Sequence, residues 1–406
     1  MFKFVHIADV HFDAPLSGKN PQLRKELKRS QREAFSKVID FSLAEEVDGL
    51  IIAGDLFDNE RISLETEKFL MESLNRLREK NIHVFYAPGN HDPVVQMKMR
   101  FEDHVHIFDR DIPTEYVIRD KKDRECHILG VGHMNEKEHR NLIRKFPGKK
   151  ENHPVIGVAH TMVESVSSDP RKGKYLPTTL EDLLEKDYDY WALGHIHQGQ
   201  QFKNHPIYYS GTIQGLDISE TGMKGGNLIK LGKNGLAVEF VPFNTLYFQQ
   251  LSLDISGEYS SDYDFYNILK GMISEEVEGV EFPASKTLYR VELTGRTNQW
   301  RYLKIPENIA YIEAEMTRDL GFKSLEFKLS KVLPQVDFEE LLVDNGILKE
   351  VMTLIASPEN DPKLTKAIRQ LKTFEGLETR DTAAVLKERE EDLKNLMMAY
   401  FAGGQS

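Results

Sequence analysis

The sequence predicts an α/β protein in which a buried sheet is covered by helices, followed by a smaller mixed domain and a helical tail. Three observations support this prediction. Short apolar runs rich in Val, Ile and Phe, each bounded by Gly, Asp or Pro, are typical of buried strands. Helical stretches separate the first three runs, and this alternation is typical of a covered sheet. A chain of 406 residues is too long for one compact core, so two or three domains are expected.

The first domain is predicted to span residues 1–245. Its expected strands are residues 2–8, 50–53, 82–87, 155–159 and 189–193. Helices are expected from Pro21 to Glu46 and from Ser63 to Lys80, between the first three strands. Short strands with Gly turns follow from about Ile207 to Val241. This change of pattern predicts that antiparallel strands close the domain.

A small α+β domain is predicted over residues 246–331. Leu288 to Leu293 and Ala310 to Ala314 have the character of strands, whereas Asp262 to Ser274 has that of a helix. Residues 332–406 are expected to be mainly helical. We therefore predict three parts in the chain.

The last segment, Thr382 to Phe401, places apolar residues at helical spacing beside a run of charged residues. This pattern predicts an amphipathic helix at the end of the chain. Two interpretations remain open for its apolar face: it packs on its own domain, or it docks on a partner protein.

The charge balance limits the kinds of partner. The chain has 53 Lys and Arg against 65 Asp and Glu, for a net charge of -12, which argues against a surface that coats DNA by general electrostatics. A nucleic acid would have to be held by local basic patches or with the help of a partner. The segment Arg24 to Arg32 carries five basic residues and is one candidate, although a solvated helix face explains it equally well.

The N-terminal residues run directly into a predicted strand, and no apolar stretch approaches eighteen residues, so a cytoplasmic protein without a membrane partner is expected. The chain has one cysteine, Cys126, which cannot form an intramolecular disulfide. It lies in a strand-like run and is predicted to be a small core residue.

Polar residues stand at the carboxyl ends of the predicted strands, where open α/β sheets bind their ligands. In chain order the segments are Asp9-Val10-His11, Gly54-Asp55-Leu56-Phe57-Asp58, Gly89-Asn90-His91-Asp92, Ala159-His160 and Gly194-His195-Ile196-His197. Each segment alone is a weak signal. Five of them in this position provide enough Asp, His and Asn side chains for two divalent ions.

Two cations about 3.5–4 Å apart are suited to in-line displacement at phosphorus, because they stabilise both the attacking and the leaving oxygen. One carboxylate must then bridge them. Mixed imidazole, carboxylate and carboxamide ligands suit manganese, iron or zinc better than magnesium. Manganese is the expected ion, with iron or zinc as alternatives.

This arrangement resembles the calcineurin-like metallophosphoesterase superfamily, whose five motifs are all present between residue 1 and about residue 212. The resemblance implies a β-sandwich core flanked by helices, followed by a small α+β cap domain and a helical C-terminal tail. It also implies that one metal is held by Asp9, His11, Asp55 and His197. The other would be held by Asp55, Asn90, His160 and His195, with Asp55 as the bridge.

His91 is assigned to neither metal. The resemblance implies that it contacts the phosphate and assists the leaving group, and an imidazole can donate a proton near neutral pH. Asp92 is predicted to orient His91 or, alternatively, to cap the following helical turn. Asp58 could accept a hydrogen bond from a ligand or cap a helix. His104, His106, His133 and His139 match no motif and are expected to be ordinary surface or core residues.

The substrate is suggested by a second segment. Tyr209-Ser210-Gly211-Thr212, followed by Glu220 and Lys224, resembles a segment of the SbcD-like DNA repair exonucleases, including their YhaO group, although Thr212-Ile213 replaces the usual Ser-Pro. The resemblance implies a DNA exonuclease whose tail docks on a coiled-coil, SMC-like ATPase. A small-nucleotide phosphodiesterase or phosphatase and a non-catalytic scaffold subunit are the alternatives. The loop from Asp169 to Tyr175 could add phosphate-binding charge and a stacking ring, and a homodimer remains open.

Overall fold

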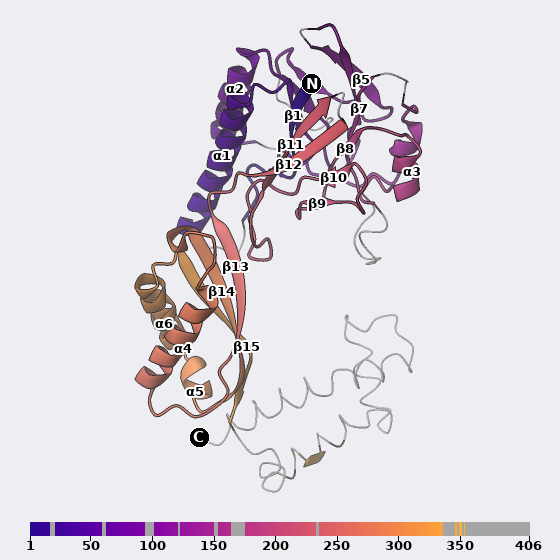
Figure 1. Cartoon of the computed structure of the whole chain (residues 1–406). Coiled ribbons are helices and arrows are strands. Elements are labelled where there is room, and N and C mark those ends of the chain that lie inside the picture. Colours follow the sequence, from indigo (N-terminus) through magenta and orange to yellow (C-terminus); the bar gives the residue numbers. More distant parts are fainter. Residues whose placement is uncertain are drawn as a thin grey trace. The chain divides into compact units, whose positions relative to one another are not determined.

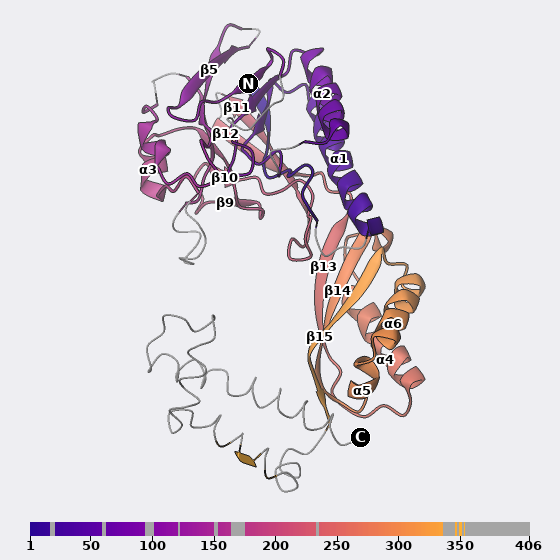
Figure 2. The same cartoon turned by 180° about the vertical axis from the view of Figure 1, so that it is seen from behind.

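The computed structural model describes residues 1–16, 21–58, 62–93, 101–120, 122–149, 153–163, 175–232 and 235–335, with Gly346, Lys349, Glu350 and Thr353. The chain divides into two compact units, Met1–Phe248 and Gln249–Ser406 (Figures 1 and 2). The predicted C-terminal helix, Thr382 to Phe401, lies outside the described residues.

The first unit contains two six-stranded mixed sheets. In spatial order, the first sheet consists of β12 (Gly235–Pro242), β11 (Gly225–Gly232), β1 (Phe2–Ile7), β2 (Gly49–Ile52), β3 (His83–Tyr86) and β4 (Val105–Ile107). The second consists of β5 (Thr114–Arg119), β6 (Glu125–Val131), β7 (Val155–His160), β8 (Tyr190–Gly194), β10 (Ile207–Tyr209) and β9 (Gln200–Gln201). All five strands predicted for the first domain are confirmed, within one or two residues of their expected ends.

A shared apolar core joins the two sheets face to face. Phe4, Ile51 and Phe85 of the first sheet belong to the same buried cluster as Ile128 and Ile156 of the second. Every residue of β2 and β7 is buried, as expected for parallel strands covered on both sides. Cys126 lies in this core, which confirms its prediction.

Helices α1 (Pro21–Ala44) and α2 (Leu64–Arg78) cover the outer face of the first sheet and lie side by side (Figure 1). Phe35 and Leu70 from these helices share a second buried cluster with Leu50 and Val84 of the sheet. The Oγ of Ser63 accepts a hydrogen bond from the backbone N–H of Thr66 and so caps α2. The outer face of the second sheet is covered by Leu183 of the short helix α3 (Leu180–Leu184) and by neighbouring loop residues.

The closure predicted from Ile207 to Val241 is only partly antiparallel. β11 pairs antiparallel with both β1 and β12, which confirms the prediction for these strands. β10 instead pairs parallel with β8, because the chain leaving β8 first turns back through β9.

The second unit has a three-stranded sheet in the order β13 (Tyr247–Asp254), β14 (Thr287–Thr297) and β15 (Ser324–Pro334). Its helices are α4 (Asp262–Val277), α5 (Trp300–Leu303) and α6 (Pro306–Asp319). Its own core includes Phe265, Val291 and Leu325. β15 runs across the boundary expected after residue 331, and the three-part division of the chain stays a prediction.

The prediction of a strand from Ala310 to Ala314 was wrong, because these residues lie inside α6. Pro306 occupies the first turn of this helix, where its missing N–H is tolerated. Ile309, Ile312 and Met316 pack into the core of the unit at helical spacing. The five-residue window was too short to reveal this period.

Gly157 in β7 lies directly against the indole ring of buried Trp191. A Cβ at this position would approach the ring to 2.3 Å. We expect Gly157→Ala to destabilise the protein by about 1–3 kcal/mol, because the ring has no free space into which to move. Denaturant unfolding measures this, with Gly148→Ala as control, since a Cβ there meets nothing within 4 Å. Equal stability of the two variants would contradict the prediction.

Candidate metal centre

The polar segments predicted to converge come from the carboxyl ends of parallel strands in both sheets. Asp9 and His11 follow β1, Asp55 follows β2, and Asn90 follows β3. From the second sheet, His160 is the last residue of β7, and His195 and His197 follow β8. The Nδ1 of His160 donates to the carbonyl oxygen of Ala53 across the two sheets at 2.9 Å. The packing of the sheets therefore brings these seven side chains to one place.

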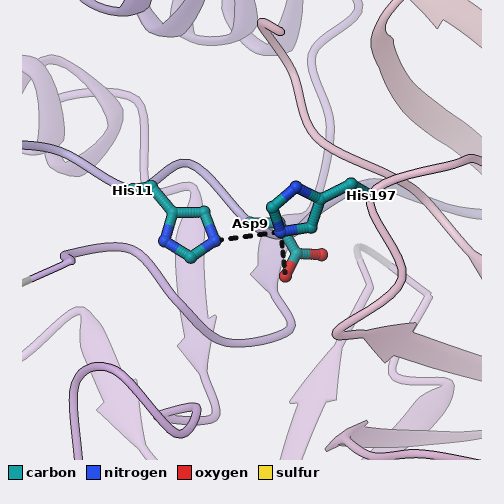
Figure 3. Close-up of side chains that lie close together, drawn as sticks. All are labelled: Asp9, His11 and His197. Carbon is teal, nitrogen blue, oxygen red and sulfur yellow. Dashed lines mark hydrogen bonds and ion pairs between the residues drawn. The ribbon is translucent and has the colours of Figure 1, made fainter. Parts of the chain in front are cut away.

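Asp9, His11 and His197 form the first cluster, and Figure 3 shows their side chains pointing toward one another. The two Nε2 atoms of His11 and His197 are 3.1 Å apart. His197 Nε2 lies 3.9 Å from Asp9 Oδ1. His11 Nε2 lies 3.8 Å from Asp55 Oδ2, so Asp55 lies beside this cluster. Asp55 is the fourth residue predicted to hold the same metal.

Asp55 also belongs to a second cluster, with His160 and Asp9. His160 Nε2 lies 3.2 Å from Asp55 Oδ2 and 3.0 Å from Asn90 Oδ1. The ring of His195 packs against that of His160 with the centroids 5.3 Å apart. The backbone N–H of His195 donates to both carboxylate oxygens of Asp9 at 3.1 Å. Asp9 thus belongs to both clusters, and Asp55 lies near an imidazole of each, His11 and His160.

The electrostatics of the buried centre favour positive charge. Burial by itself lowers the pKa of His11, but the carboxylates of Asp58, Asp55 and Asp9 outweigh it and raise this pKa to about 9. Burial also lowers the pKa of His160, but the carboxylate of Asp55 outweighs burial and raises this pKa to about 9. The pKa of Asp55 is in turn far below its usual range, despite burial, because of these imidazoles.

The backbone at the ligands is strained. Asp9, His11, Asp55 and His195 have φ angles of 52°, 53°, 49° and 99°, in the left-handed region that non-glycine residues rarely adopt. Such strain typically marks functional sites. Gly54 has φ of 95°, and a Cβ there would lie 2.2 Å from Nδ1 of His160, so only glycine allows this approach.

His91 stands at the open edge of the centre, with its side chain 43% exposed. Its Nδ1 lies 3.3 Å from Asp58 Oδ1, and the same Asp58 oxygen is 2.9 Å from Nδ1 of His11. Asp58 therefore contacts both a predicted ligand and the predicted proton donor. The sequence left its role open between a hydrogen-bond acceptor and a helix cap, and the geometry places it as the acceptor.

Asp92 is buried away from this edge and is not the carboxylate that orients His91 in this structure. Its oxygens accept hydrogen bonds from the hydroxyl of Tyr86 and from the backbone N–H groups of Phe57 and Gly89. Burial and the charge of Asp55 raise its pKa to about 6. Asp92 therefore joins the loop after β3 to the loop after β2, and Asp58 takes the position beside His91 that was predicted for Asp92.

Two residues beside the ligands were not recognised from the sequence as supporting groups. Glu220 accepts a hydrogen bond from Nδ1 of His197, and Nε2 of buried His133 donates to the backbone carbonyl of His160. Burial and the neighbouring His160 lower the pKa of His133 to about 4. His133 comes two residues after β6, so the strand-end signal that identified the ligands would also have selected it.

The remaining sequence candidates contribute less. The ring of Tyr175 packs against that of His195 at 5.0 Å, whereas the charged part of its loop, residues 169–174, lies outside the described residues. The basic segment forms part of α1, where Arg29 pairs with Glu33 and Arg32 pairs with Glu65. In the described ranges, none of the helices combines the length and apolar character needed to cross a bilayer.

The side chains fit divalent ions. Ligand atoms about 2.1 Å from a common ion lie roughly 3 to 3.5 Å from one another. The separations of 3.1 Å between His11 and His197, 3.2 Å between His160 and Asp55, and 3.0 Å between His160 and Asn90 have this size. A cation would also offset the buried carboxylates, which the imidazoles otherwise do by taking up protons.

Glu220→Gln is expected to weaken binding of the ion at His197 by about 10- to 100-fold, as is usual when the acceptor behind a ligating imidazole is changed. The amide keeps the shape of Glu220 but loses its negative charge, so His197 becomes a weaker ligand. Titration with Mn²⁺ or Zn²⁺ against a chelating indicator measures the affinity. Glu239→Gln, on an exposed strand position, serves as control. Unchanged affinity in Glu220→Gln would show that Glu220 does not support a ligand.

Comparison with known proteins identifies the family of the chain. Residues 2–199 match the calcineurin-like phosphoesterase family. The chain is 30% identical over 305 residues to the uncharacterized metallophosphoesterase YhaO of Bacillus subtilis, covering 73% of this chain and 72% of that protein. It is 24% identical over 449 residues to the DNA double-strand break repair protein Mre11 of Archaeoglobus fulgidus, covering 98% and 96%.

Among solved structures, a dimetal phosphatase from Danio rerio aligns with 60% of this chain and 99% of its own, at 13% identity and a TM-score of 0.37. The sequence similarity to YhaO extends over most of both chains, and the match of residues 2–199 covers the segments that carry Asp9, Asp55, Asn90, His160 and His195. On these grounds the chain is a member of the calcineurin-like metallophosphoesterase family.

Proposed function

We propose that this chain is a two-metal DNA nuclease, an exonuclease that hydrolyses phosphodiester bonds. The observation that carries the proposal is a pair of adjoining side-chain clusters that share Asp9, with Asp55 next to the imidazoles of both. One carboxylate between two groups of imidazoles suits two ions held close together, which is the requirement of in-line displacement at phosphorus. The seven residues Asp9, His11, Asp55, Asn90, His160, His195 and His197 would hold them.

When bound, the two divalent ions would lower the pKa of a water molecule and neutralise charge on the phosphoryl oxygens. The residues of the chain perform the other tasks. His91 donates a proton to the leaving 3′-oxygen, since its imidazole is exposed beside the centre and is assigned to neither ion. Asp58 orients this ring through Nδ1, so the other ring nitrogen, Nε2, is left for the substrate. Asp92 holds the loop that carries Asn90 and His91.

Two observations support a polymeric substrate. The side chains of His91 and His197 are 43% and 38% exposed, whereas those of Asp9 and His160 are fully buried, so the reacting side of the centre is open to large molecules. The similarity to a DNA double-strand break repair protein also extends along nearly the whole chain.

Mixed imidazole and oxygen ligands favour manganese over magnesium as the working ion.

A small-nucleotide phosphodiesterase is the second candidate, because a cavity of about 520 Å³ begins at Gln198, directly after His197. This volume is typical of small-molecule sites. Tyr208 and Phe240, from strands of different sheets, line it together with the amide of Asn227. These are groups that stack on and hydrogen-bond to a nucleobase. The same cavity could hold one base of a DNA strand, so the substrates must be compared directly.

The test compares single-stranded, double-stranded and hairpin DNA with cyclic dinucleotides and p-nitrophenyl phosphoesters, with Mn²⁺ added. Cleavage of DNA that is absent from an Asp55→Asn preparation supports the nuclease, because a contaminating enzyme would persist in both samples. Hydrolysis of the small esters with no cleavage of any DNA under any metal would overturn the nuclease and favour the second candidate.

We also propose that residues 332–406 dock on a coiled-coil, SMC-like ATPase. This part of the chain lies almost wholly outside the described residues, and the proposal rests on the amphipathic pattern of Thr382 to Phe401. Capture of the ATPase by the full chain, and its loss when Leu393 and Leu396 are both changed to Asp, would support it. Equal capture by both proteins would exclude the apolar face as the docking surface.

A further inference from the structure

We propose that Glu125, His127 and His153 form a third cation site, separate from the candidate metal centre, that binds Zn²⁺ and links the start of β6 to the chain entering β7. β6 and β7 are parallel, and their carboxyl ends lie at the metal centre. Glu125 and His127 stand at the opposite, amino end of β6, and His153 comes just before β7. The site thus lies at the other end of the same strands.

The three side chains converge on one point. His127 Nε2 lies 3.6 Å from Glu125 Oε2, and His153 Nδ1 lies 3.9 Å from the same oxygen. One ligand atom from each residue lies within 4.8 Å of the other two. The centroids of the two imidazole rings are 5.1 Å apart. Ligands of a tetrahedral zinc ion are separated by roughly 3.4 Å, and the two distances to Glu125 Oε2 exceed this value by only a few tenths of an ångström.

The environment of His127 is an independent indication that an ion binds here. Its side chain is only 10% exposed, and its Nε2 is fully buried without a hydrogen-bond partner in the described structure. A buried polar atom of this kind costs free energy unless something satisfies it. Its nearest charged neighbour is a carboxylate oxygen, which accepts but cannot donate. A cation between the two would satisfy both.

The surrounding contacts orient the ligands as metal sites require. Nδ1 of His127 is 2.7 Å from Oε1 of Glu115, an arrangement in which the carboxylate accepts the Nδ1 proton and leaves Nε2 free to coordinate. Arg119 donates two hydrogen bonds to Glu125 Oε1, at 3.1 Å from Nε and 2.5 Å from Nη2. The other oxygen of Glu125, Oε2, is therefore the one directed at the two histidines.

Two imidazoles and one carboxylate form a ligand set used for zinc, with the fourth position taken by water. Water can reach this position because the side chains of Glu125 and His153 are 26% and 39% exposed. An ion here would join the start of β6 to the chain that enters β7, and so hold together two adjacent strands that carry or support the metal centre. The competing explanation is a hydrogen-bonded cluster of Glu115, His127 and Glu125 with no metal.

Zinc content tests the site. After removal of metals by a chelator and titration with Zn²⁺, an Asp55→Asn variant, with its metal centre disabled, should still bind one ion tightly. The double variant Asp55→Asn/His153→Ala should bind no ion tightly. Using the Asp55→Asn background separates this site from the proposed function, because the result does not depend on phosphoesterase activity. An Asp55→Asn protein that binds no zinc, or a double variant that binds as much, would overturn the proposal.

Thermal stability gives a second readout. Zn²⁺ should raise the Tm of the Asp55→Asn protein and leave that of the double variant unchanged. Asp55→Asn/His139→Ala is the matched control, because His139 is exposed and belongs to no cluster in the described part of the chain, and it should respond to zinc like the single variant. Glu125→Gln in the same background removes the charge with little change of shape and should also abolish the response. A zinc response that persists in both His153→Ala and Glu125→Gln would exclude these ligands.

Discussion

Asp55→Asn is expected to abolish detectable phosphoesterase activity, with a loss of about a thousand-fold or more. Asp55 lies between the two clusters, 3.8 Å from Nε2 of His11 and 3.2 Å from Nε2 of His160. An amide cannot supply the negative charge that two adjacent cations need. Loss of the ions removes several kcal/mol of transition-state stabilisation, and about 4 kcal/mol corresponds to a thousand-fold in rate.

Metal content and activity should be measured on the same Asp55→Asn preparation. Both ions of the centre should be lost or bound much more weakly. Asp40→Asn is the matched control, because Asp40 lies on the exposed face of α1 with its side chain 62% exposed, and it should keep wild-type activity. A variant that retained two tightly bound ions and most of its activity would show that Asp55 does not bridge them.

His91→Ala is expected to lower DNA cleavage by about 10²- to 10⁴-fold while metal content stays unchanged. The side chain of His91 is exposed, and its ring contacts Asp58 and packs edge-to-face on the ring of His11 at 5.0 Å. Because His91 belongs to neither predicted ligand set, its removal takes away a proton donor and leaves the predicted ligands in place. The backbone N–H of residue 91, which donates to Asp55 Oδ1 at 2.9 Å, remains in the variant.

The choice of leaving group makes the test of His91 specific. A p-nitrophenolate ion leaves without protonation, so His91→Ala should lose much less activity on p-nitrophenyl esters than on DNA. His139→Ala, a change at an exposed histidine, is the control and should cleave both substrates normally. Loss of metal in His91→Ala, or equal loss of activity on both kinds of substrate, would contradict a role in protonating the leaving group.

The centre was more predictable than the second unit because its signal repeats along the chain. Each predicted ligand ends an apolar strand or follows one by no more than a few residues, and parallel strands present their carboxyl ends at a common edge. Residues Ala310 to Ala314 of α6 show no comparable pattern, since a window of five residues is shorter than two helical turns. Only the wider spacing of Ile309, Ile312 and Met316 distinguishes it from a strand.

Local sequence did not predict which carboxylate contacts His91. Asp92 is its neighbour in the chain, but the turn after β3 directs this side chain inward to Tyr86, Phe57 and Gly89. Asp58 reaches His91 from the loop after β2, because β2 and β3 are adjacent in the sheet. The residue next to His91 in the chain is therefore not its neighbour in space, and a hydrogen bond depends on distance in space.

By itself, the sequence determined the strand–helix alternation of the first unit and the kinds of polar side chain at its strand ends, since both follow from local periodicity and residue chemistry. The tertiary structure decided which distant residues share a partner. It placed Glu220 behind His197, Asp58 between His11 and His91, and the pair His127 and His153 at the far end of β6. These contacts depend on how strands and loops pack, which no local pattern encodes.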